Sequence, residues 1–258
     1  MSHEDLILRT HALRKSFKGF TAVSDVNLNV RRGSIHALIG PNGAGKTTCF
    51  NLLTKFIAPS DGRILFNGID ITPEKPAEIA RRGVIRSFQI SAVFPNLTAR
   101  ENVRVALLRQ SDMSWQFWRH SRALDALNEQ AMALLDLVEL GGFADVPTRA
   151  LPYGHKRALE IATTLAMEPE LMLLDEPTQG MGHEDVGRVT NLIKKVSAGR
   201  TILMVEHNMS VIASIADRIT VLQRGAILAE GTYSEVSRDP RVVEAYMGSA
   251  ESEPVGPH

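Results

Sequence analysis

The stretch GPNGAGKTT, residues 40–48, constrains the fold of this chain more than any other, because it lies between the apolar run SIHALI and the helical pattern TTCFNLLTKF. It matches G-x-x-x-x-G-K-[ST] in the strand–loop–helix setting that this pattern requires. Glycines there let backbone N–H groups surround phosphates, the lysine reaches the β- and γ-phosphates, and the hydroxyl binds magnesium. A glycine-rich turn that merely precedes a helix is the alternative. We expect a nucleotide with Mg²⁺, held by Asn42, Gly43, Ala44, Gly45, Lys46, Thr47 and Thr48, with Thr47 on the metal.

The hydrophobic pattern indicates an α/β protein. Three short apolar runs, IHALIG, LMLLDE and TILMVEH, are typical of buried parallel strands, at whose carboxyl ends ligands bind. VNLNV alternates like a half-buried strand, and RILFNGIDI predicts a hairpin that turns at Asn67-Gly68. Between residues 98 and 165 the pattern becomes helical, with capping-box spacing at Thr98 and Glu101, and we expect a helical insertion.

Composition narrows the classes of function. Lys+Arg and Asp+Glu both total 29, so the net charge is zero and we expect no nucleic-acid partner. The single cysteine, Cys49, rules out an internal disulfide and fits a reducing compartment. The start, MSHEDLILRT, lacks the apolar core of a signal peptide, and no apolar run approaches the ~18–20 residues that span a bilayer. We therefore expect a cytoplasmic chain that docks onto its partners.

The run LMLLDEPT ends in two adjacent acids. Asp175 is placed to hold magnesium, usually through water, and Glu176 to polarise the attacking water, because hydrolysis needs a carboxylate beside the γ-phosphate. The alternative is that both acids only cap the following loop. A phosphate-binding loop in the same chain favours the catalytic interpretation.

The stretch LPYGHKRALEIATTL, residues 151–165, indicates a helix with one apolar face. The amino end of a helix attracts anions through its dipole and its unpaired N–H groups. His155, Lys156 and Arg157 add positive charge to this first turn, so we expect a negative group there.

The order of these motifs resembles that of the ABC-type ATPases over about residues 5–248. The resemblance implies a P-loop NTPase (RecA-like) core with an N-terminal antiparallel β subdomain and an inserted helical subdomain. It divides the chain into a core of residues 5–89 and 166–248, a helical subdomain of residues 90–165, and a flexible tail of residues 249–258.

The same resemblance assigns further site residues. Residues 151–155 are similar to the signature motif, usually Leu-Ser-Gly-Gly-Gln, which caps the γ-phosphate of ATP bound to the other subunit. Gln89 in RSFQ looks like the glutamine that senses magnesium and the reacting water. His207 in MVEHNM looks like the switch histidine, and Phe17 in KSFKG stands where an aromatic ring stacks on adenine. Without the resemblance, Gln89 and His207 would be ordinary loop residues and Phe17 a core residue.

The chain departs from the family pattern at four positions. Pro152 replaces the signature serine, so capping must rest on backbone N–H groups near Gly154. Tyr153 replaces the first signature glycine and His155 the glutamine, while Gly182 stands where a dimer-contact aspartate is common. None of these changes touches the phosphate-binding lysine or the two acids, so the resemblance still implies hydrolysis of ATP. Tyr153, Gly154 and His155 remain candidate contacts to the nucleotide.

Within the family, the Tyr-Gly signature, VEHNM and the ending VVEAYMG resemble ATPase subunits of bacterial hydrophobic amino-acid uptake systems, including the branched-chain type. Urea-uptake ATPases are similar around GMG, and lipopolysaccharide-export ATPases are a more distant match. Implied partners are a second ATPase subunit, integral membrane permease subunits and, indirectly, a periplasmic binding protein, at the cytoplasmic face of the bacterial inner membrane. A non-transport ABC ATPase and a small-metabolite kinase are the alternatives.

Three further expectations concern surfaces. Trp115 and Trp118, in SDMSWQFWRH, are expected to pack on a helix from Arg122 to Glu139, with a partner contact as the alternative. Gln89 and the loop after it, ISAVFPNLT, form the better docking candidate, because they join the nucleotide site to the insertion. An ordinary solvated face is expected at Arg81, Arg82 and Arg86.

Overall fold

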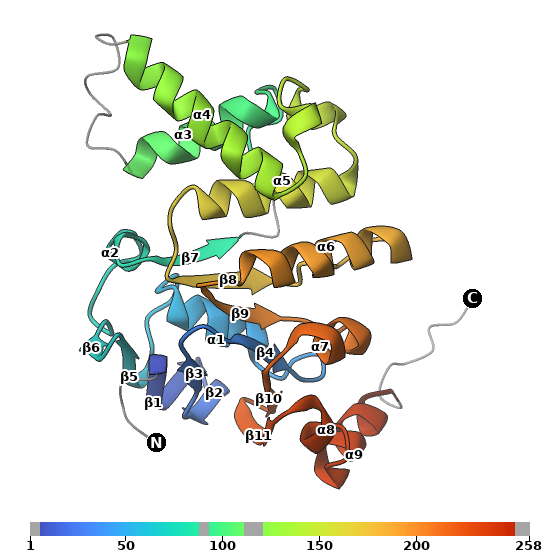
Figure 1. Ribbon diagram of the computed structural model, residues 1–258. Helices are drawn as coiled ribbons and strands as arrows, with labels where there is room; N and C mark the ends of the chain where they lie inside the picture. The colour runs from blue at the N-terminus through green and yellow to red at the C-terminus, as the bar shows by residue number, and fades with distance from the viewer. Residues whose placement is uncertain (1–5, 88–92, 111–120, 251–258) are drawn as a thin grey trace.

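The computed structural model describes residues 6–87, 93–110 and 121–250 (Figure 1). Over these ranges the chain forms two sheets and several helices that cover them. The first sheet is antiparallel around its longest strand and has the order β2-β1-β5-β6, with β3 also paired to β1. Its strands are β1 (Leu6–Phe17), β2 (Phe20–Val26), β3 (Asn29–Arg31), β5 (Asp61–Phe66) and β6 (Ile69–Asp70). The predicted antiparallel β unit is therefore present.

The second sheet has the order β11-β10-β4-β9-β8-β7, and only β11 runs antiparallel to its neighbour among these strands. Every residue of β4, β8 and β9 is buried, as the three apolar runs predict. Because these strands are parallel, the loops that follow them meet at one edge of the sheet. The strands are β4 (Ile35–Ile39), β7 (Val84–Ser87), β8 (Leu171–Asp175), β9 (Thr201–Val205), β10 (Arg218–Gln223) and β11 (Ala226–Gly231).

Two hydrophobic cores hold these layers together. Alternate residues of β8 point to opposite faces, so Leu171 and Leu173 join the core that contains α1 and the first sheet, whereas Met172 and Leu174 join the core beneath α5, α6 and α7. The helices that cover the central sheet are α1 (Lys46–Leu53), α2 (Pro76–Arg81), α5 (Tyr153–Leu165), α6 (His183–Val196), α7 (Met209–Ile215), α8 (Tyr233–Val236) and α9 (Pro240–Ala250).

The expected helical insertion contains α3 (Ala99–Gln110) and α4 (Ser121–Leu137), which pack on α5 at the top of Figure 1. Short 3₁₀ turns at Gly141–Phe143 and Thr148–Ala150 lead from α4 to α5. The predicted capping box is confirmed at α3: the Glu101 amide donates to Thr98 Oγ1 at 3.2 Å, and the Thr98 amide donates to Glu101 Oε2 at 2.8 Å.

Some boundaries differ from the sequence expectation. α4 ends at Leu137 rather than Glu139, because Glu139 takes the left-handed conformation (φ 62°) that stops a helix. α9 extends to Ala250, so the first two residues of the expected tail are helical. Trp115 and Trp118, Gln89 and residues 251–258 lie outside the described residues. Over the described ranges, none of the helices has the length and apolarity to cross a membrane.

Candidate functional site

The glycine-rich loop after β4 approaches its neighbours so closely that only glycine fits at two positions. A Cβ on Gly40 would lie 2.2 Å from the carbonyl oxygen of Leu222, and one on Gly45 would lie 2.5 Å from that of Ala22. Both glycines have positive φ, 151° and 100°. The loop thus lies against β10 and β2, and α1 begins at Lys46 with its amino end at the loop.

Lys46 lies folded over this loop. Its Nζ donates to the carbonyl oxygens of Gly40 at 2.7 Å and Pro41 at 3.1 Å. Burial lowers the pKa of Lys46, while the nearby carboxylates of Glu176 and Asp175 oppose that shift. An ammonium group that depends on weak carbonyl acceptors beside two acids fits a nucleotide phosphate, which would replace the carbonyls with charged oxygens.

The two acids stand where β8 ends beside β9. Asp175 is in register with Val205, and the Glu176 amide donates to the Val205 carbonyl at 2.9 Å. Glu176 adopts a left-handed conformation, with φ 44°, which costs a non-glycine residue about 1 kcal/mol or more. This turn changes the chain direction immediately after the strand, so that Asp175 is buried whereas Glu176 is partly exposed.

The expectation that Arg86 lies on a solvated face with Arg81 and Arg82 is wrong, because Arg86 is largely buried. Its Nη2 donates to Asp175 Oδ2 at 2.5 Å, and only 10% of its side chain is exposed. Its Nη1 donates to Asn51 Oδ1 at 2.6 Å. Arg81 and Arg82 are exposed, as expected, and Arg82 pairs with Glu74. Because β7 lies beside β8 and ends at the same edge, Arg86 reaches the site from the neighbouring strand.

His207 follows β9 at the same edge, and it is exposed. Sequence reasoning missed the residue before it, Glu206, whose side chain is fully buried. One carboxylate oxygen of Glu206 accepts from the Thr178 amide at 3.0 Å and hydroxyl at 2.5 Å, and the other accepts from the amides of His207 at 2.9 Å and Asn208 at 3.1 Å. Glu206 therefore ties the loop after β8 to the loop after β9. An acid directly after the apolar run Ile202–Val205 was the available signal.

The amino end of α5 carries the three signature-like residues. Its N-cap, Pro152, offers no side-chain acceptor to the first-turn amides. Tyr153 is exposed and donates its hydroxyl to the Gln179 carbonyl at 3.3 Å. A Cβ on Gly154 would lie 2.5 Å from Asp185 Oδ1, so this glycine permits a close approach of α6. The His155 ring packs edge-on against Phe143, with centroids 4.6 Å apart.

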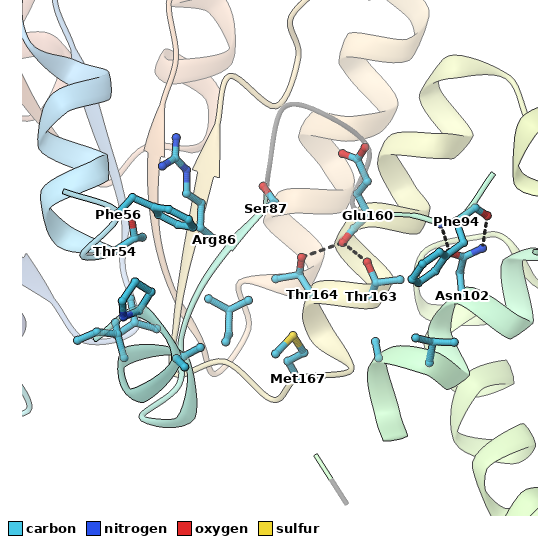
Figure 2. Close-up of a pocket in the computed structure, with 18 residues that line it drawn as sticks. Thr54, Phe56, Arg86, Ser87, Phe94, Asn102, Glu160, Thr163, Thr164 and Met167 are labelled. Atoms are coloured by element: carbon cyan, nitrogen blue, oxygen red, sulfur yellow. Dashed lines mark hydrogen bonds between the residues drawn. The ribbon is translucent and has the colours of Figure 1, made fainter. Parts of the chain in front are cut away.

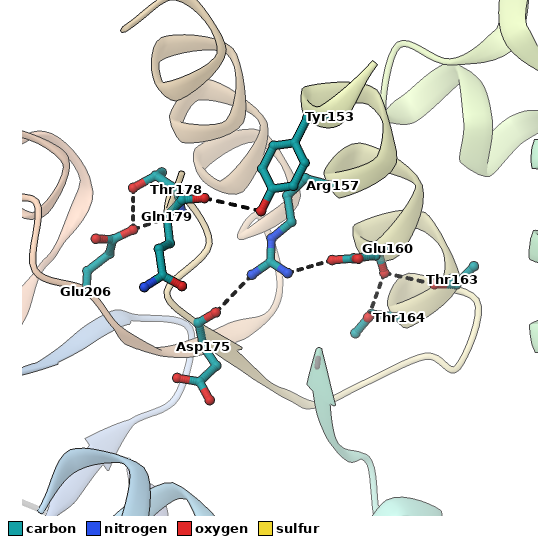
Figure 3. Close-up of polar contacts among 9 residues, drawn as sticks. All are labelled: Tyr153, Arg157, Glu160, Thr163, Thr164, Asp175, Thr178, Gln179 and Glu206. Carbon is teal, nitrogen blue, oxygen red and sulfur yellow. Dashed lines mark hydrogen bonds and ion pairs between the residues drawn. The ribbon is translucent and has the colours of Figure 1, made fainter. Parts of the chain in front are cut away.

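Arg157 was expected to help bind a negative group at the amino end of α5, but its side chain has other partners. Figure 3 shows its guanidinium turned inward, where Nη1 donates to Glu160 Oε2 at 2.6 Å and Nη2 donates to the Asp175 carbonyl at 3.1 Å. Burial raises the pKa of Glu160, and the charge of Arg157 opposes that shift. The buried pair thus fastens α5 to the end of β8, which fixes the signature-like turn relative to the acids of the same chain.

Phe17 lies on the β1–β2 hairpin and is 45% exposed, so it is not a core residue. The Lys15 Nζ lies 5.0 Å from the centroid of its ring. The second strand of this hairpin passes against Gly45 through the carbonyl of Ala22. Phe17 is therefore an exposed aromatic ring on a hairpin whose second strand touches the phosphate loop, which makes it a candidate to stack on a base.

A mostly apolar groove of 540 Å³ lies between the central sheet and the helical insertion. Figure 2 shows the exposed rings of Phe56 and Phe94 on opposite sides of it, with Met167 between them. Arg86 also lines the groove, and so does Ser87 at the end of β7. The groove therefore borders the nucleotide site through Arg86, which contacts Asp175.

The sequence of the chain matches two protein families. The family described as "ABC transporter" matches residues 23–179, and the family described as "Branched-chain amino acid ATP-binding cassette transporter" matches residues 226–252. The chain is 38% identical to the high-affinity branched-chain amino acid transport ATP-binding protein BraF of Pseudomonas aeruginosa, over 95% of this chain and 98% of that protein.

Solved structures agree with the sequence matches. The chain resembles the ADP conformation of MJ1267, an ATP-binding cassette of an ABC transporter, with a TM-score of 0.82 and 29% identity over 94% of this chain and 99% of the other. It also resembles the dimeric post-hydrolysis state of the cassette MJ0796 bound to ADP and phosphate, with a TM-score of 0.74 and 25% identity over 88% of this chain and 98% of the other.

Proposed function

Since the chain belongs to the ATP-binding cassette family of ABC transporters and is an ATP-hydrolysing subunit, we propose that its transporter imports branched-chain or other hydrophobic amino acids. The observation that carries this proposal is the 38% identity to BraF over 95% of the chain. The match of residues 226–252 to the branched-chain family supports it, because this carboxyl-terminal segment lies outside the part that ABC transporters in general match.

Dimerisation and membrane permease partners follow from this family. The proposal adds a periplasmic binding protein that delivers the substrate, and it places the chain at the cytoplasmic face of a bacterial inner membrane. A permease segment would bind in the apolar groove, where the rings of Phe56 and Phe94 are exposed to solvent. Movement there would reach Asp175 through Arg86.

The proposed reaction begins with ATP phosphates on the loop of residues 40–48, where Lys46 exchanges the carbonyls of Gly40 and Pro41 for the β- and γ-phosphate oxygens. Thr47, Asp175 and Gln89 would hold Mg²⁺, which neutralises charge on the phosphates. The Glu176 carboxylate would accept the proton of the attacking water. His207, at the end of the neighbouring strand, would donate a hydrogen bond to the γ-phosphate.

Two further contacts complete the proposed nucleotide site. Phe17 would stack on adenine, because its exposed ring stands on the hairpin that touches the phosphate loop. Tyr153, Gly154 and His155 would cap the γ-phosphate of ATP held by the partner subunit. The first-turn amides of α5 suit this role, because Pro152 gives them no side-chain acceptor.

An uptake assay tests the proposed substrate. A strain that lacks this chain would be complemented with the wild-type protein or with Lys46→Ala, and uptake of radiolabelled leucine, valine, phenylalanine, lysine and urea would be measured. Only the wild-type protein should restore uptake, and only for the hydrophobic amino acids. Restored urea uptake without amino-acid uptake would overturn the substrate but not the ATPase.

A further inference from the structure

The ion pair between Arg86 and Asp175 engages one of the proposed magnesium ligands. Nη2 and Oδ2 are 2.5 Å apart, and the two side chains are 10% and 6% exposed. A carboxylate buried to this degree needs a proton, a paired cation or a metal ion to offset its lost hydration. In this arrangement Arg86 supplies the cation. A metal ion at Asp175 would therefore meet a carboxylate that already has a counter-ion.

The helix that carries the second proposed ligand, Thr47, also holds Arg86. Nη1 of Arg86 donates to Asn51 Oδ1 at 2.6 Å, and the guanidinium carbon lies 5.7 Å from the centroid of the Phe50 ring. Asn51 follows Thr47 by four residues in α1, so both lie on one face of that helix. The guanidinium thus bridges α1 and the end of β8, the two elements that carry Thr47 and Asp175.

We infer that Arg86 is a positioning residue that competes with Mg²⁺ for Asp175 and so sets the metal affinity of the site. Its positive charge occupies one oxygen of Asp175 and repels a divalent ion that approaches the same carboxylate. To bind the metal, Asp175 must share or release the guanidinium. This inference rests on the proposed role of Asp175.

The inference is tested with Mn²⁺ as a paramagnetic probe, titrated by electron paramagnetic resonance into the full chain with ADP present. Arg86→Met keeps an unbranched apolar stem and removes the guanidinium with its charge. It should lower the Mn²⁺ concentration at half-saturation about tenfold, because Asp175 loses its competing cation. Arg86→Lys keeps the charge and should stay close to the wild type. Arg82→Met is the matched control, because Arg82 pairs with the distant Glu74, and it should change nothing.

Asp175→Asn, alone and combined with Arg86→Met, shows whether the effect passes through this carboxylate. Mn²⁺ binding should weaken in Asp175→Asn, and adding Arg86→Met should then have no tightening effect. Should Arg86→Met not fold, Asn51→Ala removes one anchor of the guanidinium and should shift the affinity in the same direction by less.

Unchanged or weaker Mn²⁺ binding in Arg86→Met would overturn the inference, and so would equal tightening in the Asp175→Asn background. Full Mn²⁺ affinity in Asp175→Asn alone would instead overturn the proposed metal ligand. The two failures are therefore distinguishable.

Discussion

Replacing Glu206 with Gln should destabilise the protein far more than its small chemical change suggests. The Glu206 carboxylate accepts four hydrogen bonds, two on each oxygen, from the loops after β8 and β9. A glutamine has one acceptor oxygen, so it serves only one of these loops. Its NH₂ group then faces either the amide and hydroxyl of Thr178 or the amides of His207 and Asn208.

The magnitude follows from the donors that lose their acceptor. An unsatisfied buried donor costs about 1–3 kcal/mol, and Gln leaves two of them while it avoids part of the cost of burying a charge. We expect a loss of about 3 kcal/mol in the free energy of unfolding. Thr178→Val removes one hydroxyl donor and leaves three of the four hydrogen bonds to Glu206, so this matched control should lose only about 1 kcal/mol.

Urea unfolding followed by circular dichroism measures the free energy of unfolding of the wild type and of both variants. The slope of this free energy against urea concentration should be the same for all three proteins, so that a difference in midpoint converts directly to a difference in stability. A Glu206→Gln protein within about 0.5 kcal/mol of the wild type, or no less stable than Thr178→Val, would refute the assignment of one oxygen to each loop.

Three other variants probe the phosphate loop, the signature-like turn and the core. Lys46→Ala should weaken ATP binding, measured with a fluorescent nucleotide, because a point charge on the phosphates is lost; unchanged affinity would contradict the loop's role. Gly154→Asp and Lys46→Ala, each inactive alone, should regain ATP-driven dimer closure when mixed, because one site then has both functional halves; no closure after verified subunit exchange would exclude capping of the partner's ATP. Burial lowers the pKa of His36 from 6.5 to about 4, so between these values the unfolded chain binds more protons and stability falls as the pH falls, by about 3 kcal/mol in all. His36→Gln should flatten that part of the stability profile measured by urea unfolding, and an unchanged profile would show that His36 is not its source.

The sequence predicted the parts of the fold that local chemistry dictates. Mostly apolar runs marked β4, β8 and β9, and parallel pairing brings the phosphate loop, Asp175 and His207 to one edge of the sheet. The hairpin turn at Asn67-Gly68 was also predictable, because an Asn-Gly pair favours the positive φ that both residues adopt in the structure. These features depend on a few neighbouring residues, so a single sequence reveals them.

Charged side chains that turn inward were not predictable in the same way. Arg86 contacts the Asp175 side chain and Arg157 contacts the Asp175 carbonyl, and Asp175 is distant from both arginines along the chain. Glu206 is satisfied by Thr178, which lies 28 residues away. Only tertiary contacts show that these charges are buried, because sequence pattern reports the average exposure of a residue type and not its partner.

The Glu176→Gln variant tests most directly whether this chain hydrolyses ATP at the edge where β4, β8 and β9 end. Glutamine keeps the size of the side chain and removes the base, so ATP should still bind and close the dimer. Phosphate release, measured with purified protein at saturating ATP with Mg²⁺, should fall by about 10² or more relative to the wild type. Near-normal phosphate release from Glu176→Gln would contradict the proposed mechanism and remove Glu176 from the role of base.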